Sequence, residues 1–387
     1  KRNFKQLKRK MLRSNNYRIP NYVSQIEPQS LNRRSKIIKF FGLIFALSLI
    51  FVLPSLFVNR SHLSDESFGT SANGNVNTDD FKFLAITDLD SGSKVGADGK
   101  KYHSLLLEGR LKRDSSTGKF EVLWGESFDL FSGHNEAGRG MELSELVEFN
   151  GHLYTMDDRS GIIFEVFEAD GGQYRVSPKM VLSEGDGSFD KGMKIEWATV
   201  KGENLFVGSF GKEYTDKTGA IVSTSNNWIA VLDSDLNPVR YDWSQYYQNM
   251  REATGTTFPG YMIHEAANWS EHLRKWVFLP RRVSAEPYDD LEDESRGSNK
   301  LLLVSEDLKN VEVREAGEVV PARGFSSFKF LPGSRDSIIV ALKSEENSEN
   351  DTQSTFITVF DLEGVVLMSE VEFPVAFKFE GIEVWPV

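Results

Sequence analysis

Cysteine is absent from the 387 residues of this sequence, which excludes a disulfide framework, a zinc site built on thiolates and a thiol nucleophile. Histidine is scarce, with six residues. Three motifs of hydrolases and nucleotide-binding proteins are also missing: a Gly-rich Walker loop, a GxSxG nucleophile elbow and an HExxH zinc motif. Carboxylates, hydroxyls and basic side chains are therefore the groups left to carry a chemical function.

Basic residues are concentrated at the beginning of the chain. The formal net charge is -12, but residues 1–39 hold twelve Lys or Arg and a single acidic residue, Glu27. The rest of the chain has 33 basic and 56 acidic residues, a balance near -23. Such an acidic body repels nucleic acid and suits divalent cations, so we expect no nucleic-acid partner.

One long apolar run, residues 40–58, contains no charged side chain. As a helix rising about 1.5 Å per residue it would cross the roughly 30 Å hydrocarbon core of a bilayer. The residues just before it are basic, so the positive-inside rule places residues 1–39 in the cytoplasm and the acidic body in the lumen or outside. This predicts a single-pass type II signal anchor. A cleaved signal peptide is the competing interpretation, and Pro54 and Ser55 leave late cleavage and a secreted form open.

Residues 59–80 are dominated by Ser, Asn, Asp, Gly and Thr, which predicts a flexible stalk. The folded domain is expected to span residues 81–387. N-glycosylation sequons begin at Asn59, Asn268 and Asn350, in agreement with a lumenal glycoprotein.

From Phe81 onward, short alternating runs rich in β-branched and aromatic residues are separated by turn signals, which indicates an all-β domain. The exception is a helix expected around residues 243–254. Five segments repeat one plan, in which a strand with a polar residue at a fixed place is followed by a turn and a second strand ending in charged residues. The polar positions lie about 50 to 70 residues apart: Ser144, Glu196, Glu265, Ser326 and Glu380.

The fifth repeat stops after one strand, and the strands beginning with FLAITDLD near the amino end can complete it. A last strand paired with the first strands closes a ring and removes the exposed sheet edges. We therefore predict a five-bladed β-propeller. Because the first strand of each blade lines the central channel, the five repeated polar residues should form a ring around the axis.

Three carboxylates facing one another in that ring would repel unless a cation bridges them. Oxygen ligands alone, with neither Cys nor an axial His, select Ca²⁺ or Mg²⁺, and a roomy ring completed by water favours Ca²⁺. His264 precedes Glu265 on a strand and should point the opposite way. The alternative is that the ring only binds water.

The second strand of each blade ends near the start of the first strand, so charged residues at those ends should gather at one mouth of the channel. The catalytic candidates there are Asp88, Asp90, Asp157, Asp158, Lys212, Arg281 and Lys343. Arg and Lys can hold phosphate oxygens, and carboxylates can bind a second ion or orient an attacking water. Each cluster alone could be a solvated turn; their shared position in the repeat favours a site.

At these residues the sequence resembles the calcium-activated nucleotidase family of soluble apyrases, over residues 81–387. The motifs that carry the resemblance are AITDLD, GRGMELSEL, YTMDDRSG, KIEWATVKG, FVGSFGKEY, PGYMIHEAANWS, FLPRR, GFSSFKF, IIVALKSEE and FEGIE. The resemblance implies a five-bladed propeller with one central Ca²⁺ bound at the five ring positions, and Arg281 of FLPRR at a position that the family needs for activity. The amino-terminal anchor is similar to that of members in the endoplasmic reticulum and Golgi membrane.

The resemblance implies calcium-dependent hydrolysis of nucleoside diphosphates, UDP and GDP before others, and also of triphosphates, in support of lumenal glycosylation. Asp88 is the first choice for the residue that orients water, with Asp157 or Asp158 second. A calcium-dependent propeller lactonase or esterase and a non-catalytic receptor stabilised by calcium are the alternatives. A homodimer is left open.

Overall fold

The computed structural model describes residues 79–96, 99–350 and 352–387. No helix within these ranges is long and apolar enough to cross a membrane. The expected cytoplasmic tail, the apolar run and nearly all of the expected stalk lie outside the described residues. The predicted type II anchor therefore stays a prediction.

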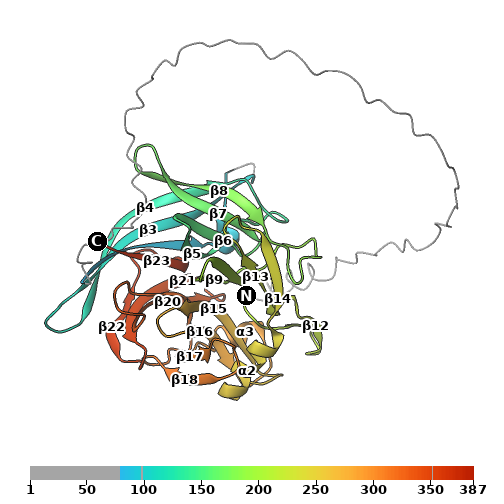
Figure 1. Ribbon diagram of the computed structural model, residues 1–387. Helices are drawn as coiled ribbons and strands as arrows, with labels where there is room; N and C mark the ends of the chain where they lie inside the picture. The colour runs from blue at the N-terminus through green and yellow to red at the C-terminus, as the bar shows by residue number, and fades with distance from the viewer. Residues whose placement is uncertain (1–78, 97–98, 351) are drawn as a thin grey trace, which may run out of the picture. The chain divides into compact units, whose positions relative to one another are not determined.

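Five antiparallel sheets, each with four principal strands, form the described part of the chain (Figure 1). The first two sheets consist of β5 (Leu143–Phe149), β6 (His152–Asp157), β7 (Ile162–Ala169) and β8 (Gln173–Val181), and of β9 (Trp197–Lys201), β10 (Asn204–Gly208), β13 (Trp228–Leu232) and β14 (Pro238–Asp242). The next two consist of β15 (Tyr261–Ser270), β16 (Lys275–Ser284), β17 (Lys300–Ser305) and β18 (Val311–Glu315), and of β19 (Arg323–Phe330), β20 (Ile338–Asn347), β21 (Thr352–Asp361) and β22 (Val366–Glu372).

The fifth sheet joins the two ends of the domain. Its order is β23 (Lys378–Pro386), β1 (Asp80–Asp88), β3 (Lys101–Arg113) and β4 (Phe120–Ser132), with the short β2 (Lys94–Val95) beside β3. β23 and β1 are antiparallel, and their register runs from Phe81 opposite Pro386 to Asp88 opposite Lys378. Figure 1 shows this closure as the red last strand beside the blue first strands. The predicted five-bladed propeller, with its carboxyl-terminal strand completing the first blade, is confirmed.

The innermost strands of the five sheets are β5, β9, β15, β19 and β23, and each contacts the next around the ring. Apolar side chains fill the spaces between neighbouring sheets, because each sheet buries both of its faces against the next blade. Trp197 and Trp269 belong to one of these clusters, between the second and third sheets. They are core residues.

The elements outside the five sheets include two α-helices and a short hairpin. The expected helix is α2 (Ser244–Thr254), which ends at Gly255 in the left-handed conformation (φ 73°). A small hairpin of β11 (Tyr214–Thr215) and β12 (Ile221–Ser223) is inserted between β10 and β13, and α3 (Asp290–Asp293) is a short helix in the acidic segment after β16. These two insertions matter because they border the central cavity described next.

Candidate metal centre and charged cavity

Three carboxylates meet where the inner strands converge. Oxygens of Glu196, Glu265 and Glu380 lie within 4.8 Å of one another, and all three side chains are largely buried. Glu196 directly precedes β9, and the other two lie in β15 and β23. The structure thus brings together the three glutamates that the repeat had selected, from three different blades.

The two serines of the ring connect neighbouring inner strands. Ser144 Oγ donates to the carbonyl of Ile195, 2.5 Å away, and Ser326 Oγ donates to the carbonyl of Phe379, 2.9 Å away. Each carbonyl belongs to the residue just before a ring glutamate. Because each hydroxyl uses its single hydrogen in this way, its lone pairs stay available to a cation.

β-Bulges explain how these side chains are aimed. The strand register skips Glu265, Ser326 and Glu380, and it skips the pair Ser144 and Glu145. A bulged strand places an extra residue against its partner and so redirects a side chain that simple alternation would send elsewhere. A register shift therefore occurs at the ring position in four of the five blades.

The donor set fits a hard divalent cation. It offers carboxylate and hydroxyl oxygens, which suit Ca²⁺, and among the described residues it includes no nitrogen or sulfur ligand. Burial raises the pKa of Glu196 to about 8, raises the pKa of Glu265, and raises the pKa of Glu380 well above its usual range, although nearby cations oppose these shifts. The basic side chains near the ring therefore do not fully neutralise the three carboxylates. A bound metal ion would supply the missing positive charge.

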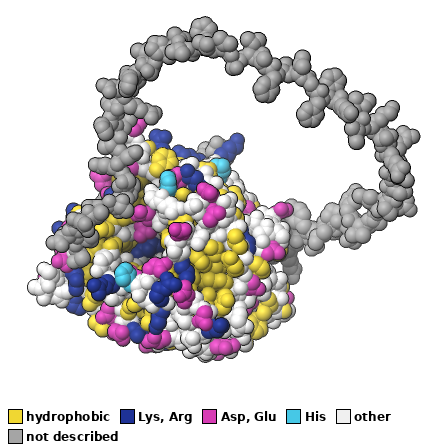
Figure 2. Space-filling view, in the orientation of Figure 1, with side chains coloured by type: hydrophobic (Ala, Val, Ile, Leu, Met, Phe, Trp, Pro, Cys, Tyr) yellow, Lys and Arg dark blue, Asp and Glu magenta, His cyan; other side chains and the backbone are white. Residues whose placement is uncertain are grey.

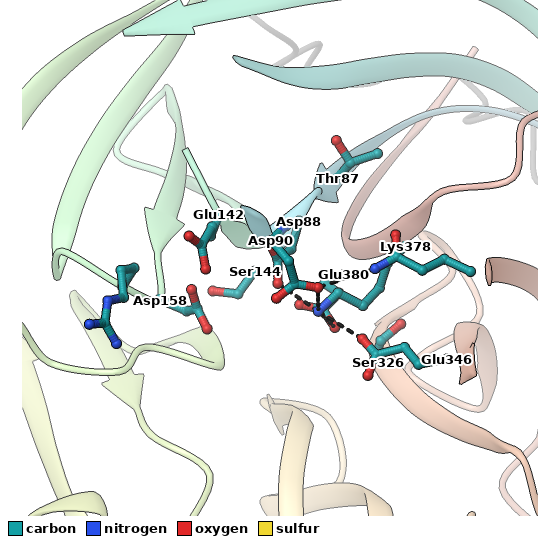
Figure 3. A network of polar contacts seen from close by, with 12 residues as sticks. Thr87, Asp88, Asp90, Glu142, Ser144, Asp158, Ser326, Glu346, Lys378 and Glu380 are labelled. Atoms are coloured by element: carbon teal, nitrogen blue, oxygen red, sulfur yellow. Dashed lines mark hydrogen bonds and ion pairs between the residues drawn. The ribbon is translucent and has the colours of Figure 1, made fainter. Parts of the chain in front are cut away.

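Basic side chains lie directly against the ring. Arg281 Nη1 is 2.5 Å from Glu265 Oε2 and 2.9 Å from Glu380 Oε1. Lys194 Nζ is 2.5 Å from Glu196 Oε1 and also contacts Asp158. Lys378 Nζ forms ion pairs with several carboxylates, which Figure 3 marks with dashed lines.

A cavity of about 590 Å³ opens above the ring, and its lining includes eleven acidic and eight basic residues. Figure 2 shows basic and acidic side chains close together on the face that it displays. Five of the predicted catalytic candidates line this cavity: Asp88, Asp90, Asp158, Lys212 and Arg281. Carboxylate oxygens of Asp88, Asp90 and Glu142 also come within 4.8 Å of one another here.

The structure does not bring Asp157 to the cavity. Its carboxylate accepts hydrogen bonds from three main-chain N–H groups, those of Met141, Arg159 and Ser160, at 2.7 to 3.0 Å. The side chain is fully buried and fastens the turn after β6. The expectation that Asp157 lies at the mouth is therefore corrected, because its successor Asp158 points into the cavity instead.

Lys343 also lies away from the cavity. Its Nζ binds Glu370 of β22 at 2.8 Å and lies over the ring of Phe325. Side chains alternate along a strand, so the residue of β20 that reaches the cavity is Glu346, three positions later. Glu346 is therefore a cavity residue that the sequence did not reveal, because Lys343 is the first charged residue of the same cluster.

The sequence also did not reveal a second set of cavity residues, which lie two positions before the ring residues. In four of the five blades the residue two positions before the ring residue lines the cavity: Glu142, Lys194, Ile263 and Lys378. Gly324 holds the same place in β19. The signal was present in the sequence, since a spacing of two keeps a side chain on one face of a strand.

Comparisons with known proteins found a matching family model and several relatives of this chain. A family model described as Apyrase matches residues 89–385. The soluble calcium-activated nucleotidase 1 of Rattus norvegicus is 42% identical over 304 residues, which cover 78% of this chain and 73% of that protein. An apyrase of Cimex lectularius is 41% identical over 306 residues, covering 78% and 82%, and apyrase apy-1 of Caenorhabditis elegans is 39% identical, covering 78% and 84%.

Proposed function

The chain belongs to the apyrase family, and on that premise we propose that it is a calcium-dependent enzyme that hydrolyses the phosphoanhydride bonds of nucleotides. The observation that carries the proposal is the convergence of Glu196, Glu265 and Glu380 beneath a cavity lined by eight basic residues. Such a site can hold a metal ion and a phosphate chain at the same place.

The ring glutamates and serines would hold Ca²⁺, which supplies charge neutralisation at the phosphate oxygens. Arg281 is positioned between two ring glutamates, and its planar guanidinium can turn its remaining N–H groups toward a phosphate. Lys194 and Lys378 approach the same ring from other blades. Together these cations orient the phosphate chain above the axis.

Asp158 is the best candidate to orient the attacking water. Its Oδ2 contacts Lys194, whereas its Oδ1 has no hydrogen-bond partner among the described residues. Both oxygens of Asp88 are engaged, one by the N–H of Asp90 at 2.7 Å and the other by Lys378 at 2.7 Å. Asp158 lines the cavity and keeps one carboxylate oxygen without a hydrogen-bond partner, which can accept a proton from water, so we place Asp158 before Asp88.

The preferred substrates in this proposal are UDP and GDP, with triphosphates also accepted, and the setting is the lumen of the endoplasmic reticulum or Golgi, with glycosylation as the process served. This part rests on the family resemblance and on the apolar run at residues 40–58. A lactonase or esterase is less well supported, because no histidine of the described residues lines the cavity to act as a base.

The proposal is tested by phosphate release from UDP, GDP, ADP and ATP, each with calcium, with magnesium and with EDTA. We expect rapid release from UDP and GDP in calcium only. A folded, calcium-binding protein that released no phosphate from any nucleotide would contradict the proposal and would favour the receptor or lactonase.

A further inference from the structure

Two buried basic side chains in the cavity lack a carboxylate within hydrogen-bond distance. Arg139, Lys194, Arg281 and Lys378 each have one within 3 Å. Arg282 is only 2% exposed, yet its Nε and Nη1 have no hydrogen-bond partner among the described residues. Lys212 is 6% exposed, and its Nζ donates to the main-chain carbonyl of Glu213 at 3.0 Å.

The backbone explains why Arg281 and Arg282 both reach the cavity although they are consecutive. The register between β15 and β16 skips Arg281, so the alternation of side chains is broken at this point. Gly324 of β19 makes room for both side chains, because a Cβ there would lie 2.4 Å from Arg281 Cγ and 2.9 Å from Arg282 Nη1. Arg281 contacts the ring glutamates, and Arg282 faces the segment that contains α3.

Asp293 at the end of α3 forms a long ion pair with Arg282 but no hydrogen bond to Arg282 or to Lys212. Its Oδ2 lies 3.6 Å from Arg282 Nε, and its Oδ1 accepts a hydrogen bond from the hydroxyl of Tyr261. Burial lowers the pKa of Lys212, and the charge of Asp293 is the strongest influence that opposes this shift. Lys212 Nζ also lies 3.9 Å from the centre of the Tyr288 ring.

We propose that Arg282 and Lys212 form a phosphate-binding subsite, separate from the ring, and that the charge of Asp293 weakens binding there. The proposal rests on the proposed hydrolysis of nucleotides. A buried guanidinium with free N–H donors is costly unless an anion completes its hydrogen bonds, and a phosphate oxygen is the anion that this reaction brings into the cavity. Lys212 has two further N–H donors for the same group.

The bound phosphate has two sources in this reaction. It can be the phosphate that stays on the nucleoside or the inorganic phosphate that is released. Inhibition by UMP reports the first source and inhibition by inorganic phosphate reports the second. Both are measured on the full chain with calcium present.

The test compares Arg282→Gln, Arg282→Lys and Asp293→Asn with the wild type. Arg282→Gln should raise KM for UDP about tenfold or more while kcat changes less than about threefold, because a charge-assisted bond to the bound group is lost. Arg282→Lys should recover only part of the affinity, since Lys lacks the planar fork. Asp293→Asn should lower KM, a change in the opposite direction that misfolding cannot produce.

Arg314→Gln is the matched control, because Arg314 lies on the outer strand β18 and pairs with Glu312 and Glu363 outside the cavity. The subsite is supported if the inhibition constant for UMP or for inorganic phosphate rises in Arg282→Gln and falls in Asp293→Asn. Which of the two inhibitors responds identifies the source of the bound phosphate. Unchanged KM and inhibition constants in both variants would overturn it. If the wild type hydrolyses no nucleotide, the proposed function has failed instead.

Discussion

Lys378 of β23 lies directly opposite Asp88 of β1, with its Nζ 2.7 Å from Asp88 Oδ2. This ion pair joins the last strand of the domain to the first, inside the cavity rather than on the surface. The same Nζ lies 2.9 Å from Glu346 Oε1, so one lysine neutralises carboxylates from two blades. Closure of the propeller and assembly of the charged cavity therefore depend on the same side chain.

Replacing Lys378 with Met should destabilise the domain. Removing one partner of a buried ion pair leaves buried carboxylates uncompensated, at a cost of about 3 to 5 kcal/mol in the free energy of unfolding. The measurement is urea denaturation without calcium. Lys275→Met is the control, since Lys275 forms a more exposed pair with Glu312 and should change stability by less than about 1 kcal/mol. Equal stability of the two variants would contradict this role of Lys378.

Asp157 and Asp158 are consecutive, and we expect their asparagine variants to fail in different ways. Asp158→Asn should lower kcat by about 100-fold or more, because the proposed water-orienting carboxylate is lost. Asp157→Asn should cost about 1 to 3 kcal/mol of stability, because a charged acceptor of main-chain N–H groups is lost, and should keep most of kcat. Steady-state kinetics and denaturation of both variants would show a reversed pattern if Asp157 were the catalytic residue.

His264 should make the fold sensitive to acid. Its ring is fully buried between Tyr247 and Phe278, and neither ring nitrogen has a partner among the described residues. Burial lowers the pKa of His264 to about 3, whereas an unfolded histidine has a value near 6.5. Between these two pH values His264 binds a proton in the unfolded chain but not in the folded chain. The free energy of unfolding therefore falls as pH drops from about 6.5 toward 3, by at most about 1.4 kcal/mol per pH unit.

The variant His264→Phe should lose this contribution. A phenyl ring fills nearly the same space and has no polar atoms to leave unpaired, so stability near pH 7 should rise by about 1 kcal/mol. Below pH 6.5 the difference between variant and wild type should widen. Denaturation at pH 7.5, 6.0 and 5.0 measures this difference, and a constant difference would mean that His264 is not the titrating group.

The sequence was sufficient to predict the blades and the ring because both follow a repeat. Ser144, Glu196 and Glu380 occupy equivalent places in their repeats, and that equivalence is visible without coordinates. The closure of the propeller was also predictable, since the last repeat lacks the strands that the amino end supplies. The blades, the ring and the closure all depend on a repeated pattern of residues, and such a pattern is visible in the sequence alone.

Which side chains face the cavity was harder to predict. A shift of one residue turns a side chain to the other face of a strand, and the bulges that produce such shifts have no sequence signature here. Lys343 and Glu346 lie on opposite faces of β20 by regular alternation, and the choice between them failed because the sequence does not show which face borders the cavity. Arg282 was passed over beside Arg281, where the register does shift. The pairing of cations with carboxylates depends on distances between blades, which the repeat does not specify.

The most direct test of the central claim is the binding of calcium measured together with activity on the same preparations of wild type, Glu196→Gln and Glu265→Gln. We predict one tightly bound Ca²⁺ per chain in the wild type, weaker binding in both variants, and a loss of nucleotide hydrolysis that parallels the loss of the ion. Full wild-type activity after calcium has been removed with EDTA, or unchanged calcium affinity in both variants, would contradict the assignment of the ring as the metal centre.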